Sequence, residues 1–136
     1  MDRPELAVRL DLEPHPEGGW YRQTWASPEV VTLADGRVRP TATLIYFLLP
    51  AGESSAWHRV RSDEIWLAHS GSVTVQLGGS GEAPEEAPTA GFVVGPESPQ
   101  GLVPAGAWQR TVPSDADALV SCLVSPGFDF ADFDLA

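Results

Sequence analysis

Short runs of apolar and β-branched residues, separated by turn-forming residues, make up most of this chain. The run at residues 73–77 alternates apolar and polar positions, as a half-exposed strand does. Residues 41–49 are rich in β-branched and aromatic residues and end at Pro50, which indicates a buried central strand. Further short strands are expected at residues 20–25, 30–33, 57–60, 64–69, 91–94, 101–104, 108–112 and 118–124.

The segments between these runs carry recognisable turn chemistry. Asp35-Gly36 is a hairpin signal between two strands. Residues 5–12 are expected to form a short helix or an extended lead-in, which Pro14 and Pro16 end because proline lacks an amide donor. Residues 78–90 have almost nothing to bury and predict a solvated loop. We expect the phenylalanines of the tail, residues 128–134, to dock on the core.

The strand pattern predicts the fold class. About nine or ten strands, spaced about 8 to 12 residues apart and without a long amphipathic helix, favour an all-β sandwich or barrel of the jelly-roll type. The length of 136 residues is usual for one domain, and no linker divides the chain. Residues 1–136 are therefore expected to form a single domain.

Composition narrows the classes of partner. A formal net charge of −11 argues against nucleic acids and anionic membrane surfaces as partners. The lone cysteine, Cys122, excludes an internal disulfide and a cysteine-rich metal site, and its apolar neighbours predict a buried side chain. The sequence shows neither a signal-peptide pattern nor an apolar run approaching the roughly 20 residues that span a bilayer. We expect a cytoplasmic protein.

Candidate chemistry begins with side chains that share one face of a predicted hairpin. His58, Val60, Glu64 and Trp66 have the same parity, so all four are expected to point into the barrel. A histidine and a carboxylate in an apolar interior should be partners, because an unpaired buried charge costs several kcal/mol. Gln109 is the first polar residue of the strand after a Pro-x-Gly turn, and it meets both groups if the two strands are neighbours.

Two stretches resemble the motifs of the cupin superfamily. The first motif, Gly-x5-His-x-His-x3-Glu-x6-Gly, is matched at Gly52, His58, Glu64 and Gly71, with Val60 in place of the second histidine. The second motif, Pro-x-Gly-x2-His, is matched at Pro104 and Gly106, with Gln109 in place of the histidine. Residues 14–22, 57–60, 62–66, 103–109 and 125–130 further resemble the small Cupin_5 family.

This resemblance implies a double-stranded β-helix and a homodimer. A typical cupin binds iron, manganese or nickel through three histidines and one glutamate, and the matching positions here are His58, Val60, Glu64 and Gln109. Valine cannot ligate a metal, and a glutamine oxygen is a weak neutral donor. We therefore expect no resident cofactor. A divalent metal, if bound weakly, would use His58, Glu64 and Gln109.

A metal-free site of this kind suits acid–base chemistry. A neighbouring carboxylate favours imidazolium while burial opposes it, so the histidine can titrate near neutral pH. The site resembles that of the metal-free sugar epimerases of the cupin superfamily. By this analogy we expect an isomerase or epimerase acting on a sugar-like or carbonyl metabolite, with His58 as base, Glu64 as orienting partner and Gln109 as polarising donor. The alternatives are a non-catalytic carbohydrate- or metabolite-binding module and a divalent-metal cupin enzyme.

Five other side chains are candidates for substrate binding. Tyr46 and Tyr21 are expected to supply a second proton-transfer group or to shape the pocket, and Trp66 to stack on a ring or sugar face. Arg22 is a candidate anchor for an anionic substrate. Glu17 precedes two glycines and is expected at the pocket rim or at a dimer contact.

The remaining two histidines are expected to be structural. His15 lies between two prolines and is interpreted as a turn residue. His69 has the opposite parity to Glu64, so it is expected to face out of the barrel or towards a second sheet.

Overall fold

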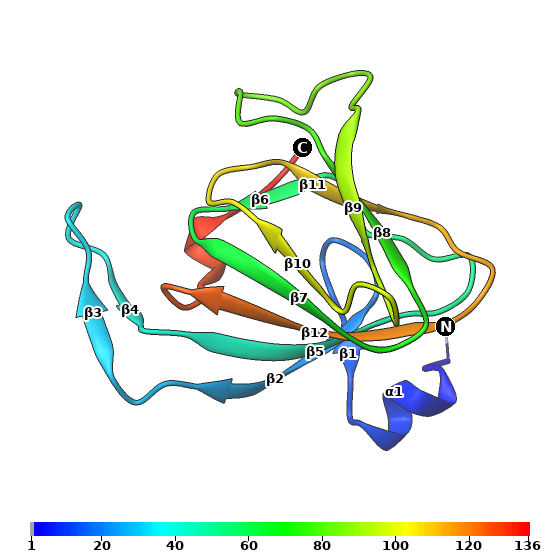
Figure 1. Ribbon diagram of the computed structural model, residues 1–136. Coiled ribbons are helices and arrows are strands. Elements are labelled where there is room, and N and C mark those ends of the chain that lie inside the picture. Colours follow the sequence, from blue (N-terminus) through cyan, green and yellow to red (C-terminus); the bar gives the residue numbers. More distant parts are fainter. Residues whose placement is uncertain (1) are drawn as a thin grey trace.

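A computed structural model describes residues 2–136, and its strands form two facing sheets that curl into one barrel (Figure 1). The larger sheet has the order β1 (Glu13–Pro14), β2 (Trp20–Ala26), β5 (Thr43–Leu49), β12 (Ala118–Ser125), β7 (Asp63–Ser70) and β10 (Gln100–Val103). The smaller sheet has the order β13 (Phe133–Leu135), β6 (His58–Val60), β11 (Gln109–Val112), β8 (Val73–Leu77) and β9 (Ala90–Val94). The remaining elements are helix α1 (Glu5–Arg9), the β3–β4 hairpin (Val30–Thr32 and Val38–Pro40) and the 3-10 turn η1 (Phe130–Asp132).

The strand pairing confirms the all-β double-stranded β-helix that the sequence predicts. Every pair of neighbouring strands is antiparallel, and most neighbours are distant in sequence, as in β2–β5–β12–β7. The Asp35-Gly36 signal does form the turn of the β3–β4 hairpin. The sequence pattern did not predict two of the strands. The strand β1 has only two residues, one of them proline. The strand β13 lies in the C-terminal tail, where apolar and acidic residues no longer alternate regularly.

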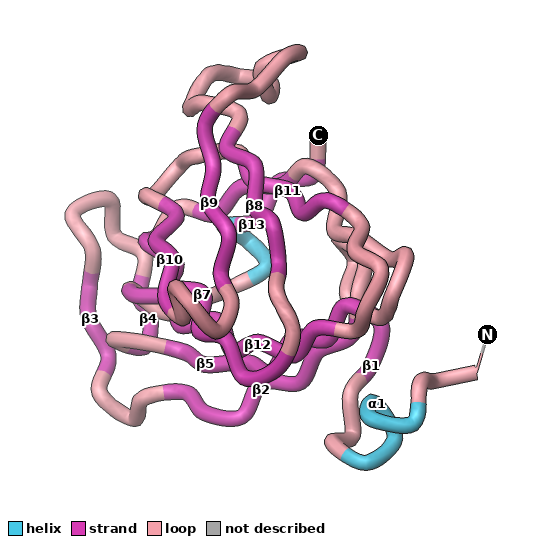
Figure 2. Tube along the Cα trace, turned by 45° about the vertical axis from the view of Figure 1, so that its right-hand side comes forward, coloured by secondary structure: helices cyan, strands magenta, loops and turns pink. Residues whose placement is uncertain are grey.

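Both faces of β5 are covered, which explains its unbroken apolar run. Phe47 and its inward-facing neighbours belong to the core cluster inside the barrel. Leu48 points the other way and packs with Trp20 and Leu12 beneath α1, on the outside of the larger sheet. Figure 2 shows α1 lying outside the barrel, below β1. Among the described residues, no helix has the length and hydrophobicity needed to cross a membrane.

Two connections extend beyond the barrel wall. The β3–β4 hairpin projects sideways from the ends of β2 and β5 (Figure 1). The loop at residues 78–90, which the sequence predicts to be solvated, extends above β8 and β9 (Figure 2). Hydrogen bonds near its start hold it to the barrel. There, the Gly81 carbonyl accepts hydrogen bonds from Arg59 and from the indole of Trp108.

Candidate functional site

A cavity of about 410 Å³ lies inside the barrel, bounded by strands of both sheets and by the C-terminal segment. Its principal polar side chains are His15, Glu17, Gln23, Thr43, His58 and Glu64. Its aromatic side chains are Tyr21, Phe128, Phe130 and Phe133. The cavity thus combines buried groups that can exchange protons with apolar ring surfaces.

Glu17 lies between two histidines. Its Oε2 is 3.2 Å from Nε2 of His58, and its Oε1 is 3.3 Å from Nδ1 of His15. All three side chains are at most about a tenth exposed. Because His58 comes from β6 and the other two from the turn before β2, only the folded chain assembles this cluster.

The backbone of Ala56 holds the cluster together. Its amide donates to the carbonyl of Glu17 at 2.7 Å, and its own carbonyl lies 2.7 Å from Nδ1 of His58. The turn can approach this closely because Gly18 has a positive φ of 106° and no side chain. A Cβ on Gly18 would lie 2.5 Å from the carbonyl oxygen of Ser54. The Glu-Gly-Gly sequence is therefore what lets Glu17 enter the barrel.

The hydrogen bonds fix where the ring protons lie. A carbonyl only accepts, so Nδ1 of His58 carries a hydrogen and Nε2 of the neutral ring has a free lone pair towards Glu17. Similarly, the amide of Glu17 donates to Nδ1 of His15 at 3.1 Å, which leaves the His15 hydrogen on Nε2. Nε2 of neutral His58 therefore presents a free acceptor to the Glu17 carboxyl group, whereas the lone pair of His15 Nδ1 already accepts from the Glu17 amide. This arrangement suits the protonated acid, whose one hydrogen can lie towards His58.

Burial favours the same neutral forms. It lowers the pKa of His58 from 6.5 to about 4, against the opposing effect of the Ala56 hydrogen bond. Burial also lowers the pKa of His15 from 6.5 to about 4, aided by the neighbouring His58. The pKa of Glu17 is well above its usual value because of burial and the nearby Glu64, although a hydrogen bond from Ser55 opposes the rise. At these separations an ion pair is geometrically feasible, but the cost of burying two charges favours the neutral pair.

A second hydrogen-bonded chain supports Glu64. The indole N–H of Trp66 donates to Oε1 of Gln109 at 3.1 Å, and Nε2 of Gln109 donates to Oε1 of Glu64 at 2.7 Å. An indole nitrogen can only donate, so it fixes which end of the amide faces Glu64. Burial raises the pKa of Glu64, while hydrogen bonds from Gln109 and the Cys122 thiol oppose the rise. Cys122 is buried, as its sequence neighbours predict.

The partner of His58 differs from the one that the sequence predicts. Parity does bring His58, Val60 and Glu64 to the same cavity. However, Glu64 hydrogen-bonds to Gln109, whereas His58 contacts Glu17. The expected rim position of Glu17 is also corrected, because this residue is buried against His58. Spacing within one hairpin could not reveal that a distant turn enters the barrel.

Several expected substrate-binding residues lie elsewhere. Arg22 and Tyr46 are opposite each other on neighbouring strands with side chains on the outer face, where Arg22 donates to the carbonyl of Leu10. The expectation that they line the pocket is therefore wrong, since strand alternation carries them to the other side of the sheet. Trp66 is 1% exposed and packs in the core behind the cavity, so it offers no free ring face. Tyr21 does line the cavity.

The two remaining histidines lie on different faces of the barrel wall, His15 at the cavity and His69 on the outside. His15 does belong to a turn, as expected, since its carbonyl accepts from the amide of Gly18. Its ring is nevertheless part of the cavity, which the sequence interpretation missed. The prolines and glycines around His15 are the sequence feature that could have indicated a tight turn entering the cavity. His69 faces out of the barrel, as expected from parity, and its Nε2 is 2.6 Å from the Ser121 hydroxyl.

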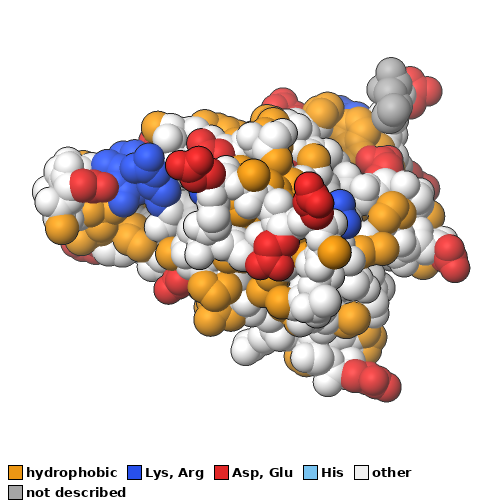
Figure 3. All heavy atoms as spheres, turned by 90° about the horizontal axis from the view of Figure 1, so that it is seen from above, with side chains coloured by type: hydrophobic (Ala, Val, Ile, Leu, Met, Phe, Trp, Pro, Cys, Tyr) orange, Lys and Arg blue, Asp and Glu red, His pale blue; other side chains and the backbone are white. Residues whose placement is uncertain are grey.

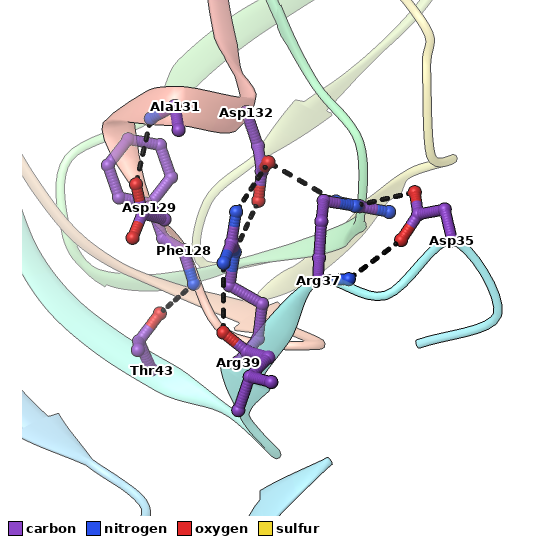
Figure 4. Close-up of polar contacts among 9 residues, drawn as sticks. Asp35, Arg37, Arg39, Thr43, Phe128, Asp129, Ala131 and Asp132 are labelled. Atoms are coloured by element: carbon purple, nitrogen blue, oxygen red, sulfur yellow. Dashed lines mark hydrogen bonds and ion pairs between the residues drawn. The ribbon is translucent and has the colours of Figure 1, made fainter. Parts of the chain in front are cut away.

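The C-terminal segment closes one side of the cavity, and ion pairs hold it to the β3–β4 hairpin. Asp132 of η1 accepts two hydrogen bonds from Arg39, at 2.8 and 3.0 Å, and lies 3.2 Å from Arg37 (Figure 4). The amide of Phe128 donates to the Thr43 hydroxyl at 2.9 Å. These contacts set the phenylalanines of this segment against the histidines, with the rings of Phe133 and His58 stacked.

The side chains at the positions of a cupin metal site do not fit a metal ion. The Gln109 oxygen accepts from Trp66, and its amino group, which cannot ligate, faces Glu64. Val60 has no donor. Among residues 2–136, no group of three or more His, Cys, Asp and Glu side chains has the geometry of a metal site. The donor set at this position thus offers one imidazole and one carboxylate.

Comparison with known proteins gives consistent matches. The family model described as Cupin_5: Cupin superfamily (DUF985) matches residues 4–136. A hypothetical protein from Leishmania major is 31% identical, with a TM-score of 0.85 over 99% of this chain and 88% of its own. A protein of Shewanella oneidensis is 34% identical, with a TM-score of 0.83 over 100% of this chain and 85% of its own.

A more distant likeness concerns the fold alone. An uncharacterized conserved protein with a double-stranded β-helix domain from Klebsiella pneumoniae is 13% identical, with a TM-score of 0.64 over 99% of this chain and 98% of its own. The search of curated proteins returned no match to this sequence.

Proposed function

This chain belongs to the Cupin_5 family of the cupin superfamily, and on that premise we propose that its barrel binds a small carbonyl metabolite and catalyses metal-independent proton transfer. The reaction class is isomerisation or epimerisation. One observation carries the proposal, namely the buried contact of 3.2 Å between Nε2 of His58 and the Glu17 carboxyl group. It joins a base and an acid within one cavity.

The two groups have complementary roles. The lone pair on Nε2 of neutral His58 removes the proton next to a substrate carbonyl, while protonated Glu17 donates its proton to the carbonyl oxygen. The product of this step is an enol, with the substrate proton on His58 and a carboxylate on Glu17. His58 then gives its proton to the neighbouring carbon, which yields an isomer, or, after the enol has turned over in the cavity, to the opposite face of the same carbon, which yields an epimer. In either case Glu17 takes back a proton from the enol hydroxyl that becomes the product carbonyl. Both side chains recover their protonation state, so the cycle balances.

The hydrogen bonds that hold His58 and Glu64 are consistent with the proposed roles. The Ala56 carbonyl accepts from Nδ1 of His58 and supports the imidazolium that forms after proton removal. Glu64 lines the cavity with its Oε1 committed to Gln109. We assign it to binding a substrate hydroxyl through its remaining oxygen. Gln109 is then a positioning residue for Glu64, since it does not line the cavity.

The same donor set favours chemistry without a metal. One imidazole and one carboxylate, with valine and an amide amino group at the other two positions, leave half of a cupin ligand set absent. Protein donors alone would hold a transition metal weakly. The proposed mechanism therefore routes every proton through His58 and Glu17.

Deuterium exchange tests this function directly. A panel of ketoses and aldoses is incubated in D₂O with the protein, and proton NMR follows the signal next to the carbonyl. Exchange is expected with the natural chain, to fall by at least about a hundredfold in His58→Asn and in Glu17→Gln, and to persist in His69→Asn, whose ring lies on the outer face. Exchange that survives His58→Asn would contradict the proposal, as would exchange that a chelator abolishes.

The same panel separates the non-catalytic alternative. A sugar that raises the melting temperature but remains unexchanged and chemically unchanged would identify a binding module in place of an enzyme. No exchange across the whole panel, combined with such stabilisation, would replace the proposed function with that alternative.

A further inference from the structure

Cationic side chains are distributed very unevenly in this protein. The sequence contains no lysine, so all eight basic residues are arginines, against 19 acidic residues. On the face shown in Figure 3, the basic side chains gather mainly near one end, while acidic side chains are spread across it. None of the arginines is among the residues that line the cavity.

Three arginines on the elements around the cavity are already neutralised. Arg39 donates to both carboxylate oxygens of Asp132, and Arg37 contacts Asp132 and Asp35. On β6, Arg59 pairs with Asp134. Reaching the cavity with any of these guanidinium groups would break an existing ion pair.

The cavity lining contains acidic side chains, whereas an anionic ligand would need a positively charged one. Its lining includes the carboxyl groups of Glu17, Glu64 and Asp129. Its two histidines are uncharged at neutral pH, since burial lowers the pKa of both to about 4. A phosphate or carboxylate placed there would lose its hydration without meeting a positive charge, which carries a large free-energy penalty.

We propose that the cavity selects uncharged or cationic ligands of about monosaccharide size and rejects ligands that carry a phosphate or carboxylate group. A volume of about 410 Å³ lies at the lower end of the range for small-molecule pockets. The rings of Tyr21, Phe130 and Phe133 present surfaces on which a sugar ring packs or a cation is attracted. This inference deepens the proposed function and rests on it only for the location of the site.

Three probes of one size and different charge test the selection at pH 7.5. They are 2-naphthylmethanol, which is neutral, 2-naphthylmethylamine, which is cationic, and 2-naphthoate, which is anionic. Titration followed by protein NMR gives the dissociation constant of each and shows whether the cavity residues respond. We expect naphthoate to bind at least about tenfold more weakly than naphthylmethanol.

An engineered cation should relieve the rejection of anions. Gln23 is exposed and lies at the cavity lining, so Gln23→Arg adds a guanidinium there without disturbing the core. We expect it to improve the affinity for naphthoate relative to that for naphthylmethanol by at least about fivefold. Gln100→Arg makes the same change in net charge at an exposed site outside the cavity, and it should not improve naphthoate binding.

Several results would overturn the inference. These are naphthoate binding as tightly as naphthylmethanol, equal gains in Gln23→Arg and Gln100→Arg, or no cavity binding by any probe at about 10 mM. The inference and the proposed function fail separately. Binding selectivity needs no turnover, and deuterium exchange on a sugar phosphate would refute the selectivity while leaving proton transfer intact.

Discussion

Replacing His58 by asparagine should remove a pH-dependent part of the free energy of unfolding. The side-chain amide of asparagine can still donate to the Ala56 carbonyl, as Nδ1 of the histidine does. It cannot titrate. The variant therefore isolates the protonation of His58 from its structural hydrogen bond, and the comparison tests whether the His58–Glu17 pair is neutral or ionic.

The sign and size of the effect follow from burial. Because burial lowers the pKa of His58 from 6.5 to about 4, the unfolded chain binds a proton between these pH values that the folded chain does not. The natural protein is therefore stabilised above pH 6.5 and loses that contribution as the pH falls towards 4. Relative to pH 7.5, the loss is about 2 kcal/mol at pH 5 and about 3 kcal/mol at pH 4.

Denaturant unfolding at pH 7.5 and pH 5.0, followed by the fluorescence of the five tryptophans, measures the effect. The free energy of unfolding of the natural chain should fall by about 2 kcal/mol more than that of His58→Asn, since the other titrating groups are common to both. His69→Asn controls for the loss of a histidine on the outer face. If acid instead favours the natural chain over the variant, His58 is an imidazolium paired with a Glu17 carboxylate, and the acid–base assignment above is refuted.

Three further outcomes are expected. Gln109→Leu leaves the buried Trp66 indole and Glu64 carboxyl group without this partner, so denaturant unfolding should show a loss of roughly 3 kcal/mol; a loss below about 1 kcal/mol would contradict this reading of the hydrogen bonds. Asp132→Asn should speed amide hydrogen exchange in β13, because it weakens the two hydrogen bonds that Arg39 donates to Asp132. Asp134→Asn changes a half-exposed ion pair, so it should alter this exchange rate little. Light scattering at micromolar concentration should give the mass of a homodimer, as the family resemblance implies, and a monomer mass would remove that expectation.

Local patterns were sufficient for most of the barrel. Strand positions depend on apolar runs and turn residues, which are short-range features, so the strand at residues 73–77 and the Asp35-Gly36 hairpin were predicted closely. Parity was also reliable where strands were regular. It brought His58 and Glu64 to one cavity and put His69 on the outer face. Arg22 and Tyr46 alternate along their strands with the cavity-lining Tyr21 and Ile45, so the same rule carries them to the outer face, against the expectation that they bind substrate.

The site needed information that no local pattern contains. Glu17 and His58 are 41 positions apart in the sequence, and their contact depends on a turn whose Gly18 fits against the Ser54 carbonyl. The spacing of the second cupin motif identified Gln109. Only the indole of Trp66, however, fixes which end of that amide meets Glu64.

By itself, the sequence determined the fold class, the family and the face on which most polar side chains lie, because alternation and turn chemistry act over a few residues. The tertiary structure decided which acid meets which base and where the ring protons lie. It also left the cavity without an arginine, a consequence of where eight guanidinium groups find partners. Pairing inside a barrel depends on how distant segments approach and on how much water they exclude, and those quantities exist only once the sheets have closed.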